Sequence, residues 1–327
     1  MTAFVLATLV KIAVVFGLLL LVVAYMTYLE RKILGHIQVR LGPMRVGYHG
    51  LLQPIADGIK LLFKEDVLPR DANKWVFRMA PMMTLIPALA AFAIIPFGDR
   101  VRVLGMPIDL VIADVNVGIL YFFALSSLGV LGFVMAGWSS NSKYPLLGGL
   151  RSSAQMISYE LTLGLSVVGV IMLAGSLSLV DIVNAQSKVP FILLQPLGFL
   201  LFVVAGVAET NRAPFDLPEA ETELVAGYHT EYSGMKFAMF FMGEYAAMIT
   251  ISALAATLFL GGWRGPLLPP VVWFLIKTFF FLFVFIWLRA TFPRLRYDQL
   301  MGYGWKVLLP LALLNILLTG GVLVIWG

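Results

Sequence analysis

Eight long apolar segments recur along the chain, and they constrain its fold more than any other feature. A helix needs roughly 20 mostly apolar residues to cross a membrane, and inside the bilayer only helices and closed barrels satisfy their own backbone polar groups. The sequence therefore predicts an all-α membrane protein, with residues 1–327 forming a single polytopic domain. The predicted spans lie near residues 3–29, 75–97, 115–138, 154–174, 191–208, 237–260, 271–292 and 305–326.

Composition agrees with this class, because 60% of the residues are hydrophobic, 13% are charged and the mean hydropathy is +0.93. These values lie far outside the range of soluble domains. The first segment is long and lacks a small-residue cleavage site, so we predict a true span and not a signal peptide. Pro81, Pro87 and Pro96 predict that the second span is kinked or broken. The run 152–155, Ser-Ser-Ala-Gln, predicts a capping box that starts the fourth span.

Lysine and arginine are distributed unevenly between the loops, which predicts the orientation. Most of the 23 basic residues lie in alternate loops, namely 30–74 with Arg78 at its edge, 139–153, 209–236 and 289–306. The opposite loops carry only Arg100, Arg102, Lys188 and Arg264. The positive-inside rule places the basic loops in the cytoplasm and both termini outside. Such a basic inner face suits anionic lipid or an acidic soluble partner.

The first basic loop contains an amphipathic segment at residues 50–64. At helical spacing one face is apolar and the other polar. The apolar face comprises Leu51, Leu52, Ile55, Ile59, Leu62 and Phe63, and the polar face Gln53, Asp57, Lys60 and Lys64. Fifteen residues are too few to span, so we predict a helix that lies along the membrane interface. Two hypotheses remain open, a plain surface anchor or a lid whose polar face lines a cavity between spans.

Residues 209–245 hold seven of the chain's 18 acidic residues, opposed only by Arg212 and Lys236. The seven are Glu209, Asp216, Glu219, Glu221, Glu223, Glu231 and Glu244. Carboxyl groups crowded together in a poorly hydrated region hold and pass protons near neutral pH. The alternative is a solvated acidic loop, within the cytoplasmic segment 209–236. We favour the first interpretation because the acids continue into a predicted span at Glu244.

Three further ionisable residues lie in or beside predicted spans. Glu160 lies well inside the fourth span, where a carboxylate is costly and is a functional candidate by default. Its predicted hydrogen-bond partners are Gln155, Ser158 and Tyr159, and the alternative is a neutral acid that only ties helices together. Glu30 lies at the membrane edge, where an ion pair with Arg31 or Lys32 is one expectation. Lys277 is predicted to be a structural counter-ion or a snorkelling amine.

Several kinds of chemistry are excluded within this chain. It has no cysteine, which excludes disulfides, thiol nucleophiles and thiolate-held iron–sulfur clusters. His36, His49 and His229 all fall in predicted loops, so no span offers a pair of haem ligands. Neither a G-x-G-x-x-G run nor a P-loop is present. The sequence therefore predicts no metal site and no catalytic redox residue of its own.

Four stretches carry a resemblance to a known family. They are ERKILGHIQVRLGP (30–43), GLLQPIADGIKLLFKED (50–66), RSSAQMISYE (151–160) and ETNRAPFDLPEAETELVAGYHTEYSGMKFAMFFMGEY (209–245). Together they resemble the H subunit of proton-pumping NADH:quinone oxidoreductase, the homologue of mitochondrial NADH dehydrogenase subunit 1. The resemblance covers essentially the whole chain, including the layout of eight spans. Met44 departs from it, since the family often has Asn after this Gly-Pro pair.

The resemblance implies a membrane subunit of a translocase in the bacterial inner membrane, at the junction with the soluble peripheral arm. Such a subunit forms the membrane part of the quinone chamber and the start of a buried acidic path. The substrate is then a quinone, ubiquinone or menaquinone, and no cofactor is bound covalently. NADH, FMN and Fe–S clusters are expected on partner subunits. The expected partners are other membrane subunits, the soluble quinone-site and Fe–S subunits, and lipid, with no nucleic acid.

Residues carried over by position fall into two groups. The acidic path comprises Glu30, Glu160, Glu209, Glu219, Glu221, Glu223 and Glu244, and the acidic stretch adds Asp216 and Glu231. The quinone-chamber region comprises Arg31, Arg40, Asp57, Lys60 and Phe63, to which we add Gln53 and Arg212. Two alternatives remain, the corresponding subunit of a related membrane-bound hydrogenase or other-donor oxidoreductase, and a stand-alone proton-coupled transporter. The transporter is disfavoured because no internal repeat is evident.

Overall fold

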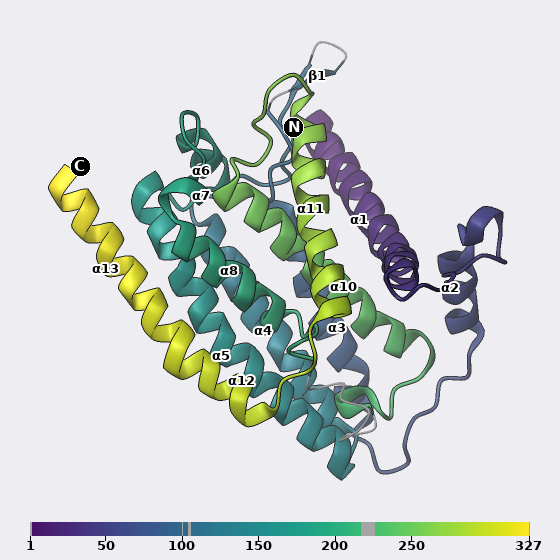
Figure 1. Ribbon diagram of the computed structural model, residues 1–327. Coiled ribbons are helices and arrows are strands. Elements are labelled where there is room, and N and C mark those ends of the chain that lie inside the picture. The colour runs from purple at the N-terminus through teal and green to yellow at the C-terminus, as the bar shows by residue number, and fades with distance from the viewer. Residues whose placement is uncertain (1, 100, 104–105, 217–225, 327) are drawn as a thin grey trace.

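The computed structural model describes residues 2–99, 101–103, 106–216 and 226–326 (Figure 1). Within these residues the protein is a bundle of helices, and seven of them are long and apolar enough to cross a membrane. The seven are Thr8–Ile37, Lys74–Ile94, Gly118–Ser139, Lys143–Ala174, Gly234–Phe259, Pro270–Thr291 and Tyr297–Ile325. The chain is therefore a helical, multi-pass membrane protein, as its sequence predicts.

The long helices are α1 (Thr2–Ile37), α3 (Lys74–Ala91), α4 (Gly118–Ser139), α5 (Lys143–Ala174), α8 (Pro196–Glu209), α10 (Gly234–Phe259), α11 (Pro270–Thr291) and α13 (Leu309–Trp326). Shorter helices are α2 (Gln53–Phe63), α6 (Leu179–Ala185), α7 (Phe191–Leu194) and α12 (Tyr297–Tyr303). Single turns are η1 (Tyr48–Gly50), η2 (Phe92–Ile94), η3 (Gly227–His229) and η4 (Gly304–Leu308). One two-stranded antiparallel hairpin, β1 (Val101–Val103) with β2 (Met106–Ile108), interrupts the all-α pattern.

The helix α10 forms the centre of the bundle. Along its most apolar stretch 72% of the residues are buried, the largest share among the seven. Apolar side chains of α5, α8 and α11 pack around it in one continuous core. At its C-terminal end Lys277 of α11 donates hydrogen bonds to the carbonyl oxygens of Leu260, Gly262 and Arg264, at 2.6–2.9 Å. Lys277 thus has a structural role, but its amine binds carbonyl oxygens at and after the end of α10, and these contacts are not those of the expected counter-ion.

The prolines affect the second predicted span only at its end. Pro81 and Pro87 lie inside α3, which continues through both. The α-helix then ends at Ala91 and becomes the 3₁₀ turn η2, which closes before Pro96. The expectation of a broken helix is confirmed at this C-terminal end, since Pro96 cannot continue a helix.

The predicted start of the fourth span is wrong, because α5 begins at Lys143 and not near 154. Ser153 lies inside the helix, where its hydroxyl donates to the carbonyl oxygen of Gly149 at 2.9 Å and caps no terminus. Pro145 lies in the first helical turn, where proline is tolerated. Gly148 leaves no room for a side chain, because a Cβ there would lie 2.6 Å from the backbone nitrogen of Tyr228. The glycine therefore marks a close helix contact.

The fifth and eighth predicted spans are each divided. Residues 191–209 form α7 and then α8, separated at Gln195, with Pro196 in the first turn of α8. By length, α8 falls short of the seven long helices. The last span begins at Tyr297, earlier than predicted, and runs through α12 and the π-helical turn η4 into α13. Gly304 of this turn packs against Tyr159, since a Cβ there would lie 3.4 Å from its ring.

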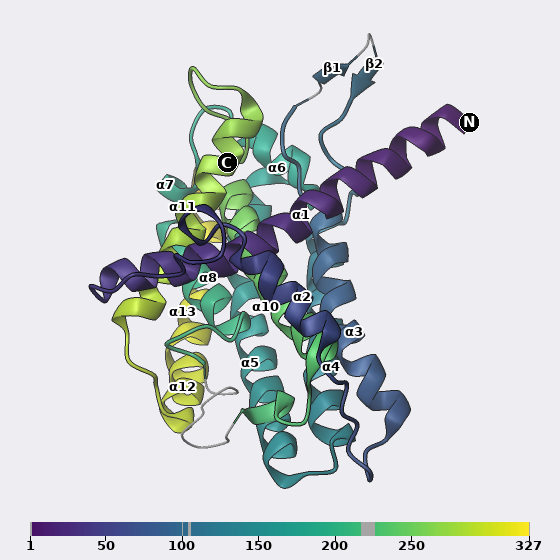
Figure 2. The ribbon, with the colours of Figure 1, turned by 90° about the vertical axis from the view of Figure 1, so that its right-hand side faces the viewer.

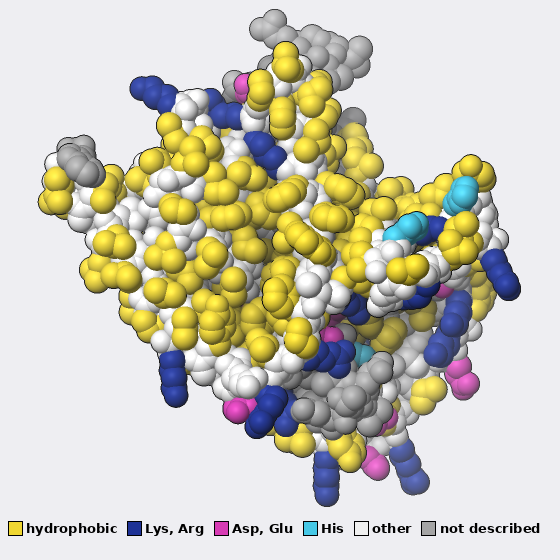
Figure 3. Space-filling model, viewed as in Figure 1, with side chains coloured by type: hydrophobic (Ala, Val, Ile, Leu, Met, Phe, Trp, Pro, Cys, Tyr) yellow, Lys and Arg dark blue, Asp and Glu magenta, His cyan; other side chains and the backbone are white. Residues whose placement is uncertain are grey.

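The helix α2 lies beside α1 at the edge of the bundle, where it also packs against α10 (Figures 1 and 2). Its bounds, Gln53–Phe63, agree with the amphipathic segment predicted at 50–64. Its apolar side chains are unusually exposed, Leu62 by 63% and Phe63 by 87%. Figure 3 shows hydrophobic side chains over the broad middle of one face of the molecule, with many Lys and Arg side chains toward its lower edge.

Candidate functional site

A cavity of about 70 Å³ lies between α3, α4, α5, α8 and α10. Most of its wall is apolar, and the polar side chains in the wall are Thr84, Ser126, Glu209, Thr210, Asn211, Glu244 and Thr250. One water molecule needs roughly 10–15 Å³ of such space and two to four polar partners. The cavity therefore has room for several water molecules beside two carboxyl groups.

Glu209 is the last residue of α8 and is only 5% exposed. The hydroxyl of Ser126, on α4, donates a hydrogen bond to its Oε1 atom. Its Oε2 atom is buried and has no hydrogen-bond partner among the described residues. Glu209 lines the cavity, and one of its carboxyl oxygens is fixed by Ser126.

Glu244 contributes the second carboxyl group of the cavity wall, from α10. The hydroxyl of Tyr228 donates to its Oε1 atom at 3.0 Å. Tyr228 is itself fully buried and packs edge-on against Phe133 and Phe240. Glu244 lies on α10, one of the helices long and apolar enough to cross a membrane, and its tyrosine partner was missed by the sequence reasoning.

Glu160 lies on α5 near this pair, and its predicted partners are wrong. Its Oε1 atom accepts a hydrogen bond from Ser127, the residue next to the serine that contacts Glu209. The three predicted partners instead donate to carbonyl oxygens. Gln155 donates to Ala208 and Phe215, Ser158 to Ala154 and Tyr159 to Leu300. Glu160 and Glu209 are close enough to interact electrostatically. Ser126 and Ser127, adjacent residues of α4, thus each donate to one carboxyl group, that of Glu209 on α8 and that of Glu160 on α5.

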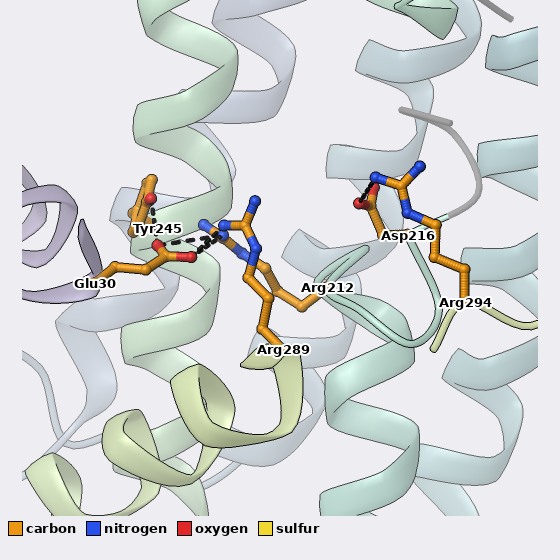
Figure 4. A network of polar contacts seen from close by, with 6 residues as sticks. All are labelled: Glu30, Arg212, Asp216, Tyr245, Arg289 and Arg294. Carbon is orange, nitrogen blue, oxygen red and sulfur yellow. Dashed lines mark hydrogen bonds and ion pairs between the residues drawn. The ribbon is translucent and has the colours of Figure 1, made fainter. Parts of the chain in front are cut away.

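A second polar cluster surrounds Glu30 of α1 (Figure 4). Arg212 Nη1 lies 3.2 Å from its Oε1 atom, Arg289 donates to the same oxygen, and Tyr245 donates to Oε2. Glu30 is buried, at 4% exposed. The expected pair with Arg31 or Lys32 is wrong, because successive helix residues point about 100° apart. The actual partners come from loops and helices distant in the sequence.

Arg212 stays ionised in this cluster. Burial alone would lower the pKa of its guanidinium, but the neighbouring Tyr245 and Glu30 raise that pKa above the ordinary arginine value. The guanidinium also lies 4.3 Å from the centre of the Tyr245 ring. Nearby, Arg294 Nη2 lies 3.0 Å from Asp216 Oδ2. Neither Glu30 nor Asp216 lines the cavity that holds Glu209 and Glu244.

The residues predicted to bind quinone are only partly brought together. Arg31 Nη1 lies 2.7 Å from Asp57 Oδ2, and Gln53 Nε2 lies 2.9 Å from Asp57 Oδ1. This polar link joins the C-terminal part of α1 to α2. The other predicted residues lie apart from it. Lys60 and Phe63 are exposed farther along α2, Arg40 is exposed in the loop after α1, and Arg212 belongs to the Glu30 cluster.

The remaining predicted acids are placed as follows. Glu219, Glu221 and Glu223 lie outside the described residues. Glu231 is half-buried and follows the turn η3. Among the described residues no group of three or more histidine and acidic side chains is arranged to hold a metal ion.

Comparison with known proteins gives a consistent result. The sequence matches the NADH dehydrogenase family over residues 10–320. It is 60% identical to an NADH-quinone oxidoreductase H subunit of Syntrophobacter fumaroxidans over 98% of this chain and 96% of that one. It is 59% identical to an H subunit of the same enzyme from Geobacter metallireducens, over 97% and 96%. It is 56% identical to one from Rhizobium meliloti, over 95% and 96%.

Proposed function

The chain belongs to the family of NADH-quinone oxidoreductase H subunits, and from that premise we propose that it couples quinone reduction to proton movement through its buried carboxyl groups. The observation that carries the proposal is the cavity shared by Glu209 and Glu244. Carboxyl groups inside a membrane protein are costly and mark proton relays. The family match supports this assignment over the two alternatives, a stand-alone transporter and a subunit of a related complex.

The proposed path runs from Glu160 through Ser127 and Ser126 to Glu209, and across the cavity to Glu244. Ser127 donates to Glu160 and Ser126 to Glu209. A hydroxyl group also accepts hydrogen bonds without being ionised, so water is proposed to link the two serines and, in the cavity, Glu209 to Glu244. Tyr228 holds Glu244 in position by its hydrogen bond.

Glu219, Glu221 and Glu223 are proposed to continue this path toward the quinone chamber, with Glu231 beside them. They follow Glu209 and Asp216 closely in the sequence. A change in the charge or position of the quinone then alters the protons held by neighbouring carboxyl groups. Such a local change in charge biases a two-state element in the adjoining membrane subunits.

The quinone chamber is proposed to lie where α2 meets α1. Support comes from the polar link of Arg31, Asp57 and Gln53, which faces away from the exposed apolar side of α2. An amphipathic helix with such an exposed apolar side suits the membrane interface. Lys60, Phe63 and Arg40 then lie near the opening of the chamber, and Arg212 contributes its inner wall through the Glu30 cluster.

The membrane topology is proposed to comprise eight spans, with α7 and α8 together forming the fifth. Their combined run, 191–209, approaches the length of a span. Figure 1 supports this number, because the N- and C-terminal ends lie toward the same end of the bundle, which requires an even number of crossings. The basic loops lie toward the opposite end, so both termini are placed outside the inner membrane.

The partners are proposed to be the other membrane subunits, the soluble quinone-site and Fe–S subunits, and lipid. The basic cytoplasmic loops provide the docking surface. NADH, FMN and Fe–S clusters are assigned to the soluble subunits, because this chain has neither cysteine nor a nucleotide-binding motif. Its own substrate is the quinone, ubiquinone or menaquinone.

The test compares two electron-transfer activities in the assembled complex. Glu209→Gln and Glu160→Gln are expected to leave NADH oxidation by an artificial acceptor nearly normal, because that acceptor takes electrons before the quinone. The same changes are expected to depress quinone reduction and the proton gradient. Asp298→Asn is the matched control, since Asp298 lies on an exposed surface pair with Arg296. Assembled glutamine variants that keep wild-type quinone reduction and gradient would rule out this path.

A further inference from the structure

The turn at residues 210–216 connects the cavity to the rest of the acidic segment. It follows Glu209 directly, and Asp216 is the last described residue before Glu219, Glu221 and Glu223. Asn211 adopts a left-handed conformation with φ of 50°. The backbone nitrogen of Arg212 donates to the carbonyl of Val207, at 3.3 Å. The position of this turn therefore determines the direction of the Glu209 side chain. It also sets the point at which the rest of the acidic segment begins.

One side of the turn is fixed by α5. The Nε2 atom of Gln155 donates to the carbonyl oxygens of Phe215, at 2.8 Å, and Ala208, at 2.9 Å. Gln155 is fully buried, so these bonds are shielded from water. They span the turn, because Ala208 precedes it and Phe215 lies near its end.

The other side is fixed by residues 289–297, which we call the arginine strap. Arg294 pairs with Asp216 at 3.0 Å, and the backbone nitrogen of Leu295 donates to the carbonyl of Pro214, at 3.2 Å. At the start of the strap Arg289 binds Glu30, which also accepts from Arg212 in the turn (Figure 4). The strap thus contacts the turn at its end directly and at Arg212 through Glu30.

Both carboxyl groups in these contacts are poorly suited to carry protons. Each is bound to a guanidinium, which cannot give up its proton in a protein. Protonation of Glu30 would leave the buried Arg212 without its counter-charge, which is strongly unfavourable. Neither carboxyl group lines the cavity that contains Glu209 and Glu244.

We infer that Glu30 and Asp216 are positioning residues, through which the arginine strap fixes the turn at 210–216 and hence the proton path that starts at Glu209. This inference rests on the proposed function and narrows it, because it removes two acids from the set of proton carriers. It also assigns a role in proton coupling to Arg294, a residue of the basic cytoplasmic rim that touches no carrier.

The test uses two variants of the whole complex that separate the ion pair from the acid. Asp216→Asn keeps an oxygen that accepts from Arg294 but carries no proton. Arg294→Leu keeps the carboxyl group of Asp216 but removes its partner. Arg296→Leu is the control for docking, because Arg296 lies in the same strap and the same proposed docking surface but pairs with the exposed Asp298 and not with the turn. The measurements are the rate of quinone reduction and the number of protons moved per NADH. They are compared in complexes whose NADH oxidation by an artificial acceptor is normal.

If Asp216 is a positioning residue, the quinone reduction and proton pumping of Asp216→Asn should stay within about twofold of wild type. In Arg294→Leu both activities should fall about two- to fivefold, which corresponds to the free energy of a half-exposed ion pair. The opposite order, with Asp216→Asn uncoupled and Arg294→Leu normal, would show that Asp216 carries protons and would overturn the inference. Equal, wild-type values for both would overturn it as well. If Arg294→Leu assembles poorly, Arg294→Lys, which keeps the charge, is expected to recover coupling. Failure of the proposed path itself is seen separately, in Glu209→Gln.

Discussion

Filling the cavity without changing any titratable group tests whether water connects Glu209 to Glu244. Gly129 of α4 lies in the cavity wall, and a Cβ built there meets no heavy atom within 4 Å. Gly129→Leu therefore directs four carbon atoms into about 70 Å³, a space for about five water molecules. Because each carbon is about the size of a water molecule, most of the water is displaced.

Gly129→Leu is not expected to destabilise the fold. Burying a leucine side chain contributes about 1.5–3 kcal/mol, whereas fixing its rotamer costs about 0.5–1 kcal/mol. Replacing a helical glycine also removes a penalty of about 1 kcal/mol. The complex is thus expected to assemble, so that a loss of activity reports on the cavity and not on the fold.

Proton pumping by Gly129→Leu in reconstituted vesicles is expected to fall at least tenfold, which corresponds to about 1.4 kcal/mol in the barrier. NADH oxidation by an artificial acceptor should stay normal. Gly129→Ala, which adds one methyl group and leaves most of the space, should pump nearly as wild type does. Gly17→Leu makes the same substitution at an exposed position of α1 and serves as a second control. Wild-type pumping by an assembled Gly129→Leu complex would refute the water-filled path.

Three further predictions concern other contacts. Glu30→Gln should destabilise the complex by about 3–5 kcal/mol because Arg212 stays buried without a counter-charge. Arg289→Gln should cost only about 1 kcal/mol, since Arg289 is 39% exposed. Thermal denaturation of the purified complex should show this order. Lys277→Met removes three hydrogen bonds from the end of α10 and should cost about 1–3 kcal/mol, seen as a smaller amount of assembled complex. Asp57→Asn should raise the apparent KM for short-chain quinones or change inhibitor sensitivity, and a change in assembly alone would make α2 structural.

Much of the fold was predictable because membrane-spanning helices appear in the sequence as continuous apolar runs. Errors occurred where a helix extends beyond the apolar run. Lys143 was placed in the loop 139–153, yet α5 begins there, and Gly148 allows the close approach of η3. The start of the last helix at Tyr297 was missed for a similar reason, since the basic residues around it resemble a loop.

The candidate site was predictable in its acids but not in their partners. Glu160, Glu209 and Glu244 stand out because charge is rare in apolar segments. Ser126 and Ser127 do not, although two adjacent hydroxyl groups in an apolar helix are a signal that could have been used. The partners of Glu30 lie 182 and 259 residues away, and no local pattern predicts such contacts. Only packing brings Arg212 and Arg289 to the same carboxylate.

In the proposed path the carboxyl group of Glu209 exchanges a proton when quinone is reduced. Infrared difference spectroscopy of the intact complex, recorded before and after quinone reduction, measures this directly through the carboxyl C=O stretching band. The account predicts a band change in the wild-type complex that is absent in Glu209→Gln and retained in Asp298→Asn. A wild-type band change that persists unaltered in both Glu209→Gln and Glu244→Gln would contradict the account.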